Sequence, residues 1–591
     1  MLAKGHVRLV RLLTRFGYGL ASFDLHRPED WKTAGRGGHL AGASVVNGGS
    51  TAAWKPPPRS ERGEALLQFS GEFADAGGSS DGSLSGSGGR REWTVAYSHA
   101  SAKAKGVLLS RWVGPALTGL LLALCFPPYH LWPLVFVALG PLLASLCTGG
   151  GFGRGYLMGL VFLGLLISWM RYLTPFGEQA YAGLVLYRAL FYGLFGALFA
   201  AVRTRRGVTA ALLTAPFLWA GVEYVSSLGP LGFPWGLMGQ PLWGLPPLIQ
   251  IAEVGSTYIL AVLLVGVNAA FVALGFNLRV GPPYVVGALL LLSADLAYGA
   301  WRLTVPLPEG PRVWVALVQG NVPQEVKVTA EGVMQMWAQH RRLTLRRVRG
   351  RAQVVVWPET ALPTYLPWSL TLREGVSALA RVMDAALLIG SVDVEDERTI
   401  YNSAFVVEPN GRFGDVYHKV HLVVFGEYTP FKEQLPFMRI FSVRDPDYTA
   451  GRVYGPVRTP GGAVGTPICY ESTFPQIARQ FVRRGAEWLC VITNDAWFDG
   501  TGETLQHASL SVFRAIETRR WVARCANTGL TGFISPQGFL TATVPLQTEA
   551  VAEHEITRQR TETFYVRYGD VFAWLCLAVS AGALGKHRTR R

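Results

Sequence analysis

The chain has 591 residues, more than one ordinary domain requires. Half of the residues are hydrophobic, only 16% are charged and the mean hydropathy is +0.24, so the composition excludes an ordinary soluble enzyme and indicates a polytopic membrane protein. The net charge of +15 does not indicate nucleic-acid binding, because the basic residues are scattered or lie at the ends of apolar segments, without an aromatic-basic surface.

Residues 1–106 differ from the rest of the chain. They include the Gly/Ser-rich run 77–89 and the stretch Lys55-Pro56-Pro57-Pro58, compositions typical of flexible or extended linkers. We expect a disordered, low-complexity N-terminal extension here. The alternative is that translation begins near Val107 and that the extension is never made.

From Val107 onward, apolar stretches recur that are each long enough to cross a bilayer. We expect a transmembrane domain of about seven helices over residues 107–301, and a further membrane helix within a C-terminal segment, 570–591, that ends in a basic tail. The expected spans are 107–126, 130–147, 153–173, 181–202, 208–228, 248–275, 283–301 and 570–585.

The charges between these spans predict their orientation. Arginines such as Arg154, Arg203 and Arg279 follow the second, fourth and sixth spans, whereas the opposite loops are nearly free of basic residues, with Arg171 the main exception. Loops rich in Lys and Arg are cytoplasmic. Seven crossings therefore place residues 302–569 on the extracytoplasmic side, and the basic C-terminal tail in the cytoplasm.

Residues 302–569 show short apolar runs that alternate with helical segments, a pattern that favours a buried sheet covered by helices. The expected helices are 332–348 and 474–484. The expected strands are 313–319, 353–357, 386–390, 403–407, 463–468 and 488–493.

Six cysteines occur, without the spacing of a metal site or a disulfide framework. Cys469 is distinct because the apolar run 463–468 delivers it to a turn before a helical segment. Backbone N–H groups at such a turn favour a thiolate and can bind an oxyanion. The alternative for a lone cysteine is a buried apolar position in a strand.

Two further stretches supply the groups that a cysteine nucleophile requires. Glu359 ends the buried-type strand 354–358, and Lys419 interrupts the largely apolar run 417–428. A carboxylate can take the thiol proton and an ammonium can stabilise the developing oxyanion, together with the backbone N–H of Tyr470. Taken singly, Glu359 is more typical of a helix N-cap acid and Lys419 of a surface lysine.

The motifs WPET, YHKVHLVVFGEY, ICYES and NDAWF, in this order, resemble those of the nitrilase superfamily with its Glu-Lys-Cys triad. More narrowly, they resemble its membrane-anchored branch, the apolipoprotein N-acyltransferases of bacteria. The similarity covers the chain from about Leu108 to the C-terminus. The resemblance implies a polytopic α-helical membrane domain plus an extracytoplasmic α/β nitrilase-like α-β-β-α sandwich, located in the inner (cytoplasmic) membrane.

The resemblance also implies an activity: transfer of a fatty acyl chain from a membrane phospholipid, through a Cys469 thioester, to the α-amino group of a diacylglyceryl-cysteine at the N-terminus of an apolipoprotein. The catalytic residues would be Glu359, Lys419 and Cys469. We expect no metal or other cofactor, no nucleic acid and a monomer. A membrane-bound amidase that hydrolyses a small amide with the same triad is the alternative, and a transporter or scaffold is a third reading.

Three residues are expected to support the triad. By the resemblance, Glu427 is a second acid that orients Lys419 or handles a proton. Tyr470 and Glu471 follow the nucleophile and are expected to shape its turn and to line the acyl site, although core packing explains Tyr470 nearly as well.

The resemblance suggests a substrate role for three other residues, each with a plainer alternative. Trp235 lies in an outer-loop FPW segment, where an aromatic belt residue is the alternative. Asn494 and Trp497 belong to NDAWF, where a generic Asn-Asp turn is the alternative.

An apolar, aromatic run over 425–441 predicts a mobile lid that contacts lipid, with Phe437 and Phe441 as its anchors; ordinary core is the alternative. Val328 stands where the family usually has tryptophan, so an aromatic wall of the site is absent or supplied by Trp337. We interpret the histidines at 418, 421 and 507 as polar residues with satisfied hydrogen bonds.

Overall fold

The computed structural model describes residues 111–173, 176–442 and 446–585. All of them belong to one compact unit, Gly86–Arg591. The predicted N-terminal extension 1–106 and the basic tail from residue 586 lie outside the described residues.

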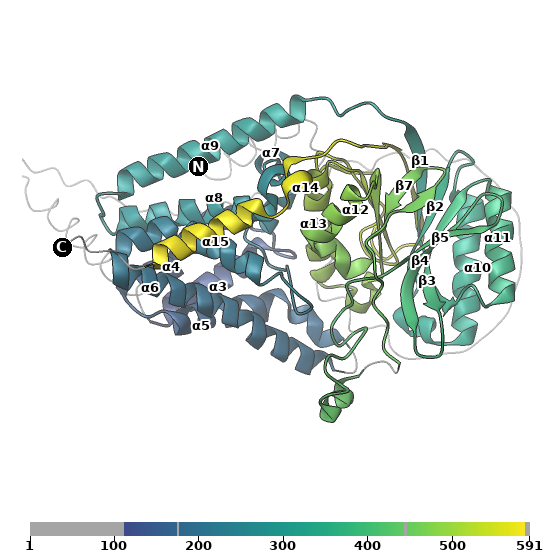
Figure 1. The fold of residues 1–591 in the computed structure, drawn as a ribbon, viewed down its shortest axis with the longest axis horizontal. Helices are drawn as coiled ribbons and strands as arrows, with labels where there is room; N and C mark the ends of the chain where they lie inside the picture. The colour runs from purple at the N-terminus through teal and green to yellow at the C-terminus, as the bar shows by residue number, and fades with distance from the viewer. Residues whose placement is uncertain (1–110, 174–175, 443–445, 586–591) are drawn as a thin grey trace, which may run out of the picture. The chain divides into compact units, whose positions relative to one another are not determined.

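The first part of the described chain consists of apolar helices (Figure 1). Three of these, α6, α8 and α9, are long and apolar enough to cross a membrane, and the others are shorter. The elements are α3 Val113–Cys125, η2 Trp132–Phe136, α4 Gly140–Thr148, α5 Phe152–Leu166, η3 Ser168–Tyr172, α6 Gly177–Val225, η4 Gln240–Gly244, α7 Pro246–Ile249, α8 Ala252–Gly275 and α9 Gly281–Thr304, with α15 Val571–Leu584 near the C-terminus.

The predicted spans 181–202 and 208–228 correspond to the two helical segments of α6. The segments are separated at Gly207, where the backbone is not helical and φ is 88°. This conformation is easy for glycine and strained for other residues. Beside Gly207, Arg206 donates to the carbonyl of Gly582 at 2.8 Å, so the basic run caps the C-terminal end of α15 instead of only marking a loop.

The second predicted span, 130–147, is divided into the 3₁₀ helix η2 and the helix α4. A proline lies in the first turn of each, Pro133 in η2 and Pro141 in α4. Proline is compatible with the first turn of a helix but not with its interior. The two elements therefore cannot merge into one straight helix.

The rest of the described chain contains two six-stranded sheets. The first sheet has the order β12-β1-β2-β3-β4-β5, and the second has the order β11-β10-β9-β8-β7-β6. The strands are β1 Arg312–Gln319, β2 Val354–Tyr365, β3 Ala386–Val394, β4 Ile400–Val407, β5 Phe413–His418, β6 Val457–Thr459, β7 Gly462–Gly465, β8 Trp488–Thr493, β9 Val522–Ala526, β10 Gly532–Ile534, β11 Leu540–Thr541 and β12 Ala550–Thr557.

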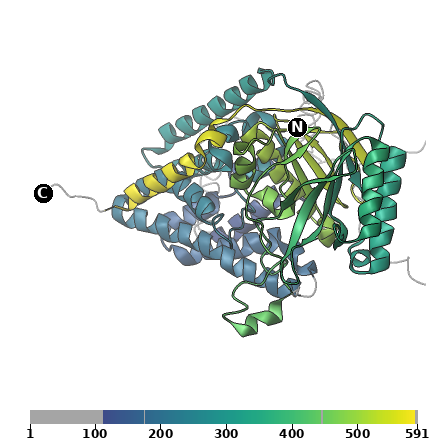
Figure 2. The same cartoon turned by 45° about the vertical axis from the view of Figure 1, so that its right-hand side comes forward.

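Helices cover both outer faces of the paired sheets. The helices α10 Ala330–Arg347 and α11 Leu370–Met383 lie on the first sheet (Figures 1 and 2). The helices α12 Pro475–Arg483 and α13 Glu503–Thr518 pack on the second, and the short α14 Phe564–Tyr568 precedes α15. These layers confirm the predicted helical domain followed by an α-β-β-α sandwich.

Alternation of side chains along β2 explains the layering. Val355 and Trp357 belong to the core between the first sheet and α10 and α11, whereas Val354 and Val356 belong to the core between the two sheets. Successive residues of a strand point to opposite faces, so a strand buried on both faces is apolar throughout. Trp337 packs against Trp357, with ring centroids 5.9 Å apart, in the outer core.

Candidate active site

Glu359 lies in an irregular part of β2. The pairing of β2 with β3 shifts between Trp357 and Leu362, and Thr360 has a φ of 46°. A bulge of this kind re-aims a side chain that would otherwise continue the regular alternation. The Glu359 carboxylate is buried and accepts hydrogen bonds from Asn402 Nδ2 at 2.8 Å and from the backbone N–H of Asn494 at 3.0 Å.

Lys419 directly follows β5 and is almost completely buried, with 1% of its surface exposed. Its Nζ lies 3.0 Å from the Glu427 carboxylate and 3.5 Å from Glu359 Oε1. Burial alone would lower the pKa of Lys419, but the carboxylates of Glu427 and Glu359 outweigh it and raise the pKa. The structure therefore holds a cation between two carboxylates, away from bulk water.

Asn402 completes this network and was not anticipated from the sequence. Its Nδ2 donates to Glu359 Oε1 and to Glu427 Oε1, each at 2.8 Å. The second oxygen of Glu427 accepts from the backbone N–H of Val423 at 2.8 Å. A polar residue within the apolar strand 400–407 was the available signal, because a buried amide requires partners.

Cys469 begins the 3₁₀ turn η7 Cys469–Thr473, after β7 has ended at Gly465. Its φ of 52° is left-handed, which is strained for a residue other than glycine. Of the six cysteines, five are buried and Cys469 is partly exposed. Although part of the residue is exposed, its thiol is buried, and this burial, followed by the charge of Glu359, raises the pKa of Cys469 well above its usual range, while Lys419 opposes the shift.

Glu471 joins the segments that carry Cys469 and Lys419. Its fully buried carboxylate accepts from the backbone N–H groups of Ile468, Val420 and His421 at 2.8–2.9 Å, and from the Tyr417 hydroxyl at 2.8 Å. Burial raises its pKa to about 7, although these hydrogen bonds oppose the shift. Glu471 thus fixes the relative position of the two segments.

Tyr470 contacts the loop that carries Trp235. The Tyr470 hydroxyl donates to the carbonyl of Gly232 at 2.9 Å, and its ring stacks on Phe233, with centroids 6.0 Å apart. Trp235 is 3% exposed and donates from its indole N–H to Gln506 Oε1 at 2.8 Å. Trp235 is therefore buried beside Phe233, the residue of the same loop that contacts Tyr470.

The two residues of the NDAWF motif have different environments. Asn494 is buried, donates to Gln324 Oε1 at 2.8 Å and accepts from Asn527 Nδ2 at 3.0 Å. Trp497, in the turn after β8, is 40% exposed. Asn494 thus belongs to the hydrogen-bonded wall of the site, and Trp497 offers an open aromatic surface.

The predicted lid falls on residues that the structure describes only in part. The backbone over Pro436–Phe441 forms the 3₁₀ helix η6, but the side chains of Phe437 and Phe441 lie outside the described ones, as does that of Val328. Nearby, Phe431 is 62% exposed and Ile440 is 69% exposed. The lid therefore stays a prediction.

Two of the histidines have hydrogen-bond partners, as expected. His418 Nδ1 lies 2.9 Å from Ser403 Oγ, and both ring nitrogens of His507 have polar neighbours. The expectation is wrong for His421, whose buried Nε2 has no hydrogen-bond partner among the described residues. Its ring packs on Phe474 instead, with centroids 4.2 Å apart.

Comparisons with known proteins cover both parts of the chain. Residues 118–270 match the family model of the apolipoprotein N-acyltransferase N-terminal domain, and residues 314–565 match that of carbon-nitrogen hydrolases. An apolipoprotein N-acyltransferase from Geobacter metallireducens is 35% identical over 485 residues, which are 79% of this chain and 93% of the relative.

Another apolipoprotein N-acyltransferase, from Chlorobaculum tepidum, is 31% identical over 510 residues, covering 80% of this chain and 95% of the relative. A solved carbon-nitrogen hydrolase from Helicobacter pylori aligns with 44% of this chain and 95% of its own, at 18% identity and a TM-score of 0.34. The identity to full-length relatives, across both the helical and the α/β part, shows that the chain belongs to the apolipoprotein N-acyltransferase family.

Proposed function

We propose that this protein transfers a fatty acyl chain from a membrane phospholipid to the α-amino group of the diacylglyceryl-cysteine that begins an apolipoprotein. Family membership supports the reaction class. The observation that carries the chemistry is the buried network in which Lys419 contacts Glu359 and Glu427, beside a partly exposed Cys469. An integral membrane position suits a substrate that is itself a lipid.

The first step forms the acyl-enzyme. Because burial keeps the Cys469 thiol protonated, attack requires a base, and Glu359 takes the proton as Sγ bonds to the ester carbon of the phospholipid. Lys419 and the backbone N–H of Tyr470 stabilise the oxyanion. The carbon–oxygen bond then breaks, Glu359 returns the proton to the leaving oxygen, and a lysophospholipid departs from the Cys469 thioester.

The second step consumes the thioester. The neutral α-amine of the apolipoprotein attacks the thioester carbon, Glu359 accepts a proton from the attacking nitrogen, and the carbon–sulfur bond breaks. The Cys469 sulfur recovers the proton from Glu359, so the enzyme returns to its starting state. The product is an N-acylated lipoprotein, and no redox partner is required.

Glu427 and Glu471 support these steps without bonding to substrate. Glu427 holds Lys419 and shares Asn402 with Glu359, which keeps the cation directed at the reaction centre. Glu471 holds the turn of Cys469 against the segment of Lys419. Tyr470 is proposed to line the acyl site at the contact with Gly232.

Substrate contacts are proposed at Trp235, Asn494 and Trp497, with Phe437 and Phe441 as lid residues above the lipid. The exposed Trp497 and the exposed side chains around η6 support an apolar entrance. Trp235 would act through packing, because its indole is buried.

The proposed location is the inner (cytoplasmic) membrane, in a multi-pass arrangement with residues 302–569 outside and the protein monomeric. The positive-inside pattern supports this orientation. The proposed boundaries remain 107–301 for the membrane domain, 302–569 for the catalytic domain and 570–591 for the C-terminal helix and tail. Hydrolysis of a small amide is not favoured, since the chain matches apolipoprotein N-acyltransferases over nearly their full lengths.

Acyl transfer is tested with a synthetic peptide that begins with diacylglyceryl-cysteine, mixed with the purified protein and phospholipid whose acyl chains carry ¹³C. We expect a mass increase of one labelled acyl group on the peptide, and none with Cys469→Ala. A matched peptide whose α-amine is acetylated should stay unchanged. Release of labelled fatty acid without any acylated peptide contradicts the proposal and indicates a hydrolase.

A further inference from the structure

The helix α13 is buried along almost all of its length, and two neighbouring residues near its start have different partners. Gln506 contacts the apolar helical part: it accepts from the indoles of Trp169 and Trp235 at 3.1 and 2.8 Å, and donates to the carbonyl of Pro127 at 2.8 Å. The next residue, His507, contacts the nucleophile segment.

The Nε2 side of His507 faces the turn of Cys469. Nε2 lies 3.2 Å from the carbonyl oxygen of Cys469 and 3.0 Å from Ser472 Oγ, whose hydroxyl itself donates to the Cys469 carbonyl at 2.7 Å. These contacts converge on the one residue of the turn with a left-handed φ. Strain of that kind persists only where surrounding contacts hold it.

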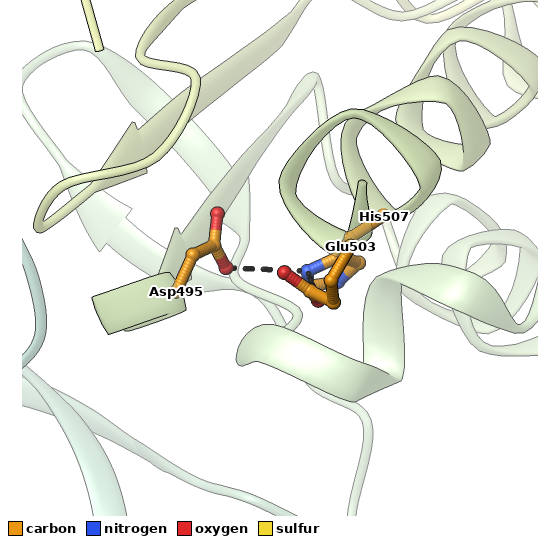
Figure 3. A group of neighbouring side chains, drawn as sticks. All are labelled: Asp495, Glu503 and His507. Atoms are coloured by element: carbon orange, nitrogen blue, oxygen red, sulfur yellow. Dashed lines mark hydrogen bonds and ion pairs between the residues drawn. The ribbon is translucent and has the colours of Figure 1, made fainter. Parts of the chain in front are cut away.

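The Nδ1 side of His507 faces a buried charge cluster. Nδ1 lies 3.2 Å from Arg524 Nη2, 3.3 Å from Asp495 Oδ1 and 3.5 Å from Glu503 Oε1; Figure 3 shows the two carboxylates and the imidazole together. Arg524 also donates to Asp495 Oδ2 at 2.9 Å.

The protonation of the cluster follows from these charges. Burial and then Arg524 lower the pKa of His507, so the ring is neutral, and the Arg524 cation outweighs burial to hold the pKa of Asp495 below its usual range. Burial, with Asp495 beside it, raises the pKa of Glu503, which is therefore protonated. The carbonyl oxygen of Cys469 can only accept, so Nε2 carries the ring proton, and Nδ1 is left to accept from Arg524 Nη2. The nearby Asp495 carboxylate accepts from Thr493 and Arg524 instead of from Nδ1.

A metal site is the other chemistry that this cluster suggests. Ligand atoms of Asp495, Glu503 and His507 all lie within 4.8 Å of one another. However, the Arg524 guanidinium already contacts Asp495 and His507 Nδ1, and supplies the positive charge that a metal ion would bring. The geometry therefore favours an internal hydrogen-bond relay.

We infer that His507 is a positioning residue whose Nε2–H holds the carbonyl of Cys469, and so keeps the thiol in its reactive orientation, with Arg524 fixing the tautomer. The inference rests on the proposed role of Cys469 as the nucleophile. Gln506, the residue before His507, accepts from the Trp235 indole, and the ring centroids of Trp235 and His507 are 5.7 Å apart. The same turn of the helix therefore contacts both the segment of the thiol and a loop of the apolar domain.

The test compares His507→Gln with His507→Asn and His507→Ala in the full-length protein in detergent. A glutamine amide reaches about as far as Nε2, whereas an asparagine amide stops near Nδ1. Ser511→Ala is the matched control, because Ser511 lies on the same buried helix and its hydroxyl has no partner among the described residues.

The readouts are the rate of Cys469 alkylation by iodoacetamide and the rate of acyl addition from phosphatidylethanolamine micelles, both followed by mass. We expect both rates to fall about 10-fold or more in the Ala and Asn variants, as release of a strained residue predicts. The Gln variant should recover to within about 3-fold of wild type. The lipid concentration for half-maximal rate should stay unchanged in all of them.

Wild-type rates in His507→Ala would overturn the inference. So would equal losses in the Gln and Asn variants, since these would show that the hydrogen-bond donor is irrelevant. If His507→Ala does not fold, the Gln and Asn pair decides alone. A wild-type protein that takes no acyl group, while its alkylation still depends on His507, would reject the proposed function and leave the positioning role supported.

Discussion

The two halves of the candidate site are built in different ways. On the first sheet and in the segment that follows its last strand, Glu359, Asn402, Lys419 and Glu427 form a network of side chains that contact one another directly. On the second sheet, Cys469 is held mainly through its backbone, by a left-handed φ and hydrogen bonds to its carbonyl. Charged groups for the reaction therefore come from the side of the first sheet, and the placement of the nucleophile comes from the side of the second.

Glu471 is the link between the halves, because it accepts from both segments at once. It is itself buried, so its own charge is costly and its hydrogen bonds must be complete. Changes within the first half should therefore lower the acylation rate most. Changes at Glu471 should affect stability and the relative position of the two halves. Changes at the edge of the second half should have the smallest effect on rate and stability.

The largest effect is expected for Lys419→Met, which removes the cation but keeps most of the side-chain stem. The oxyanion loses a donor and two buried carboxylates lose their partner, so the rate of peptide N-acylation should fall by about 10²- to 10³-fold or more. The control is Arg412→Met, which breaks only an exposed ion pair with Glu408 and should leave the rate unchanged. A loss below 10-fold for Lys419→Met would show that the charged network of the first half does not carry the chemistry.

A medium effect, on stability, is expected from pH. Burial raises the pKa of Glu471 from 4.5 to about 7, so between these values the folded protein keeps a proton that the unfolded chain has lost. The contribution of Glu471 to stability is therefore complete below about pH 4.5 and declines as pH rises toward 7. Thermal unfolding in detergent should show a midpoint that decreases over this range.

The matched variant for that experiment is Glu471→Gln, which cannot titrate. At acidic pH its unfolding midpoint is expected to be lower than that of wild type, because replacing the carboxyl by an amide disturbs the hydrogen bonds from four donors. The midpoint should then decrease less steeply with pH than in wild type. Parallel curves for the two proteins would mean that Glu471 is ionised at all these pH values, contrary to the buried link described above.

The smallest effect is expected for Tyr470→Phe. It removes one hydrogen bond, to the carbonyl of Gly232, and keeps the stacking on Phe233. A typical hydrogen bond contributes about 0.5–1.5 kcal/mol, so the N-acylation rate should change by only a few fold. A loss as large as that of Lys419→Met would show that the hydroxyl takes part in the chemistry and that the two halves are not divided as proposed.

The sequence predicts the parts of the site that lie in short motifs with a clear reason for each residue. Glu359 and Cys469 follow apolar runs, Lys419 interrupts one, and the structure brings the segments of all three to one region. Their catalytic roles remain proposals. Most strands are also predictable, because buried strands are nearly continuous apolar runs.

Other features could not be predicted, for physical reasons. Asn402 is polar within an apolar strand, and only the folded position of Glu427 explains it. The helix α13 was not predicted, and its polar side chains are buried with its apolar ones, because they bind partners that only the fold supplies, as Gln506 and His507 do.

The central claim is that acyl transfer passes through Cys469, and the most direct measurement is the intact mass of the protein after incubation with phospholipid alone. We expect one added fatty-acyl group in wild type that hydroxylamine removes, and none in Cys469→Ala. The added group should disappear when the diacylglyceryl peptide is supplied. A folded, lipid-supplied protein that never gains this mass, yet acylates the peptide, would contradict the thioester route.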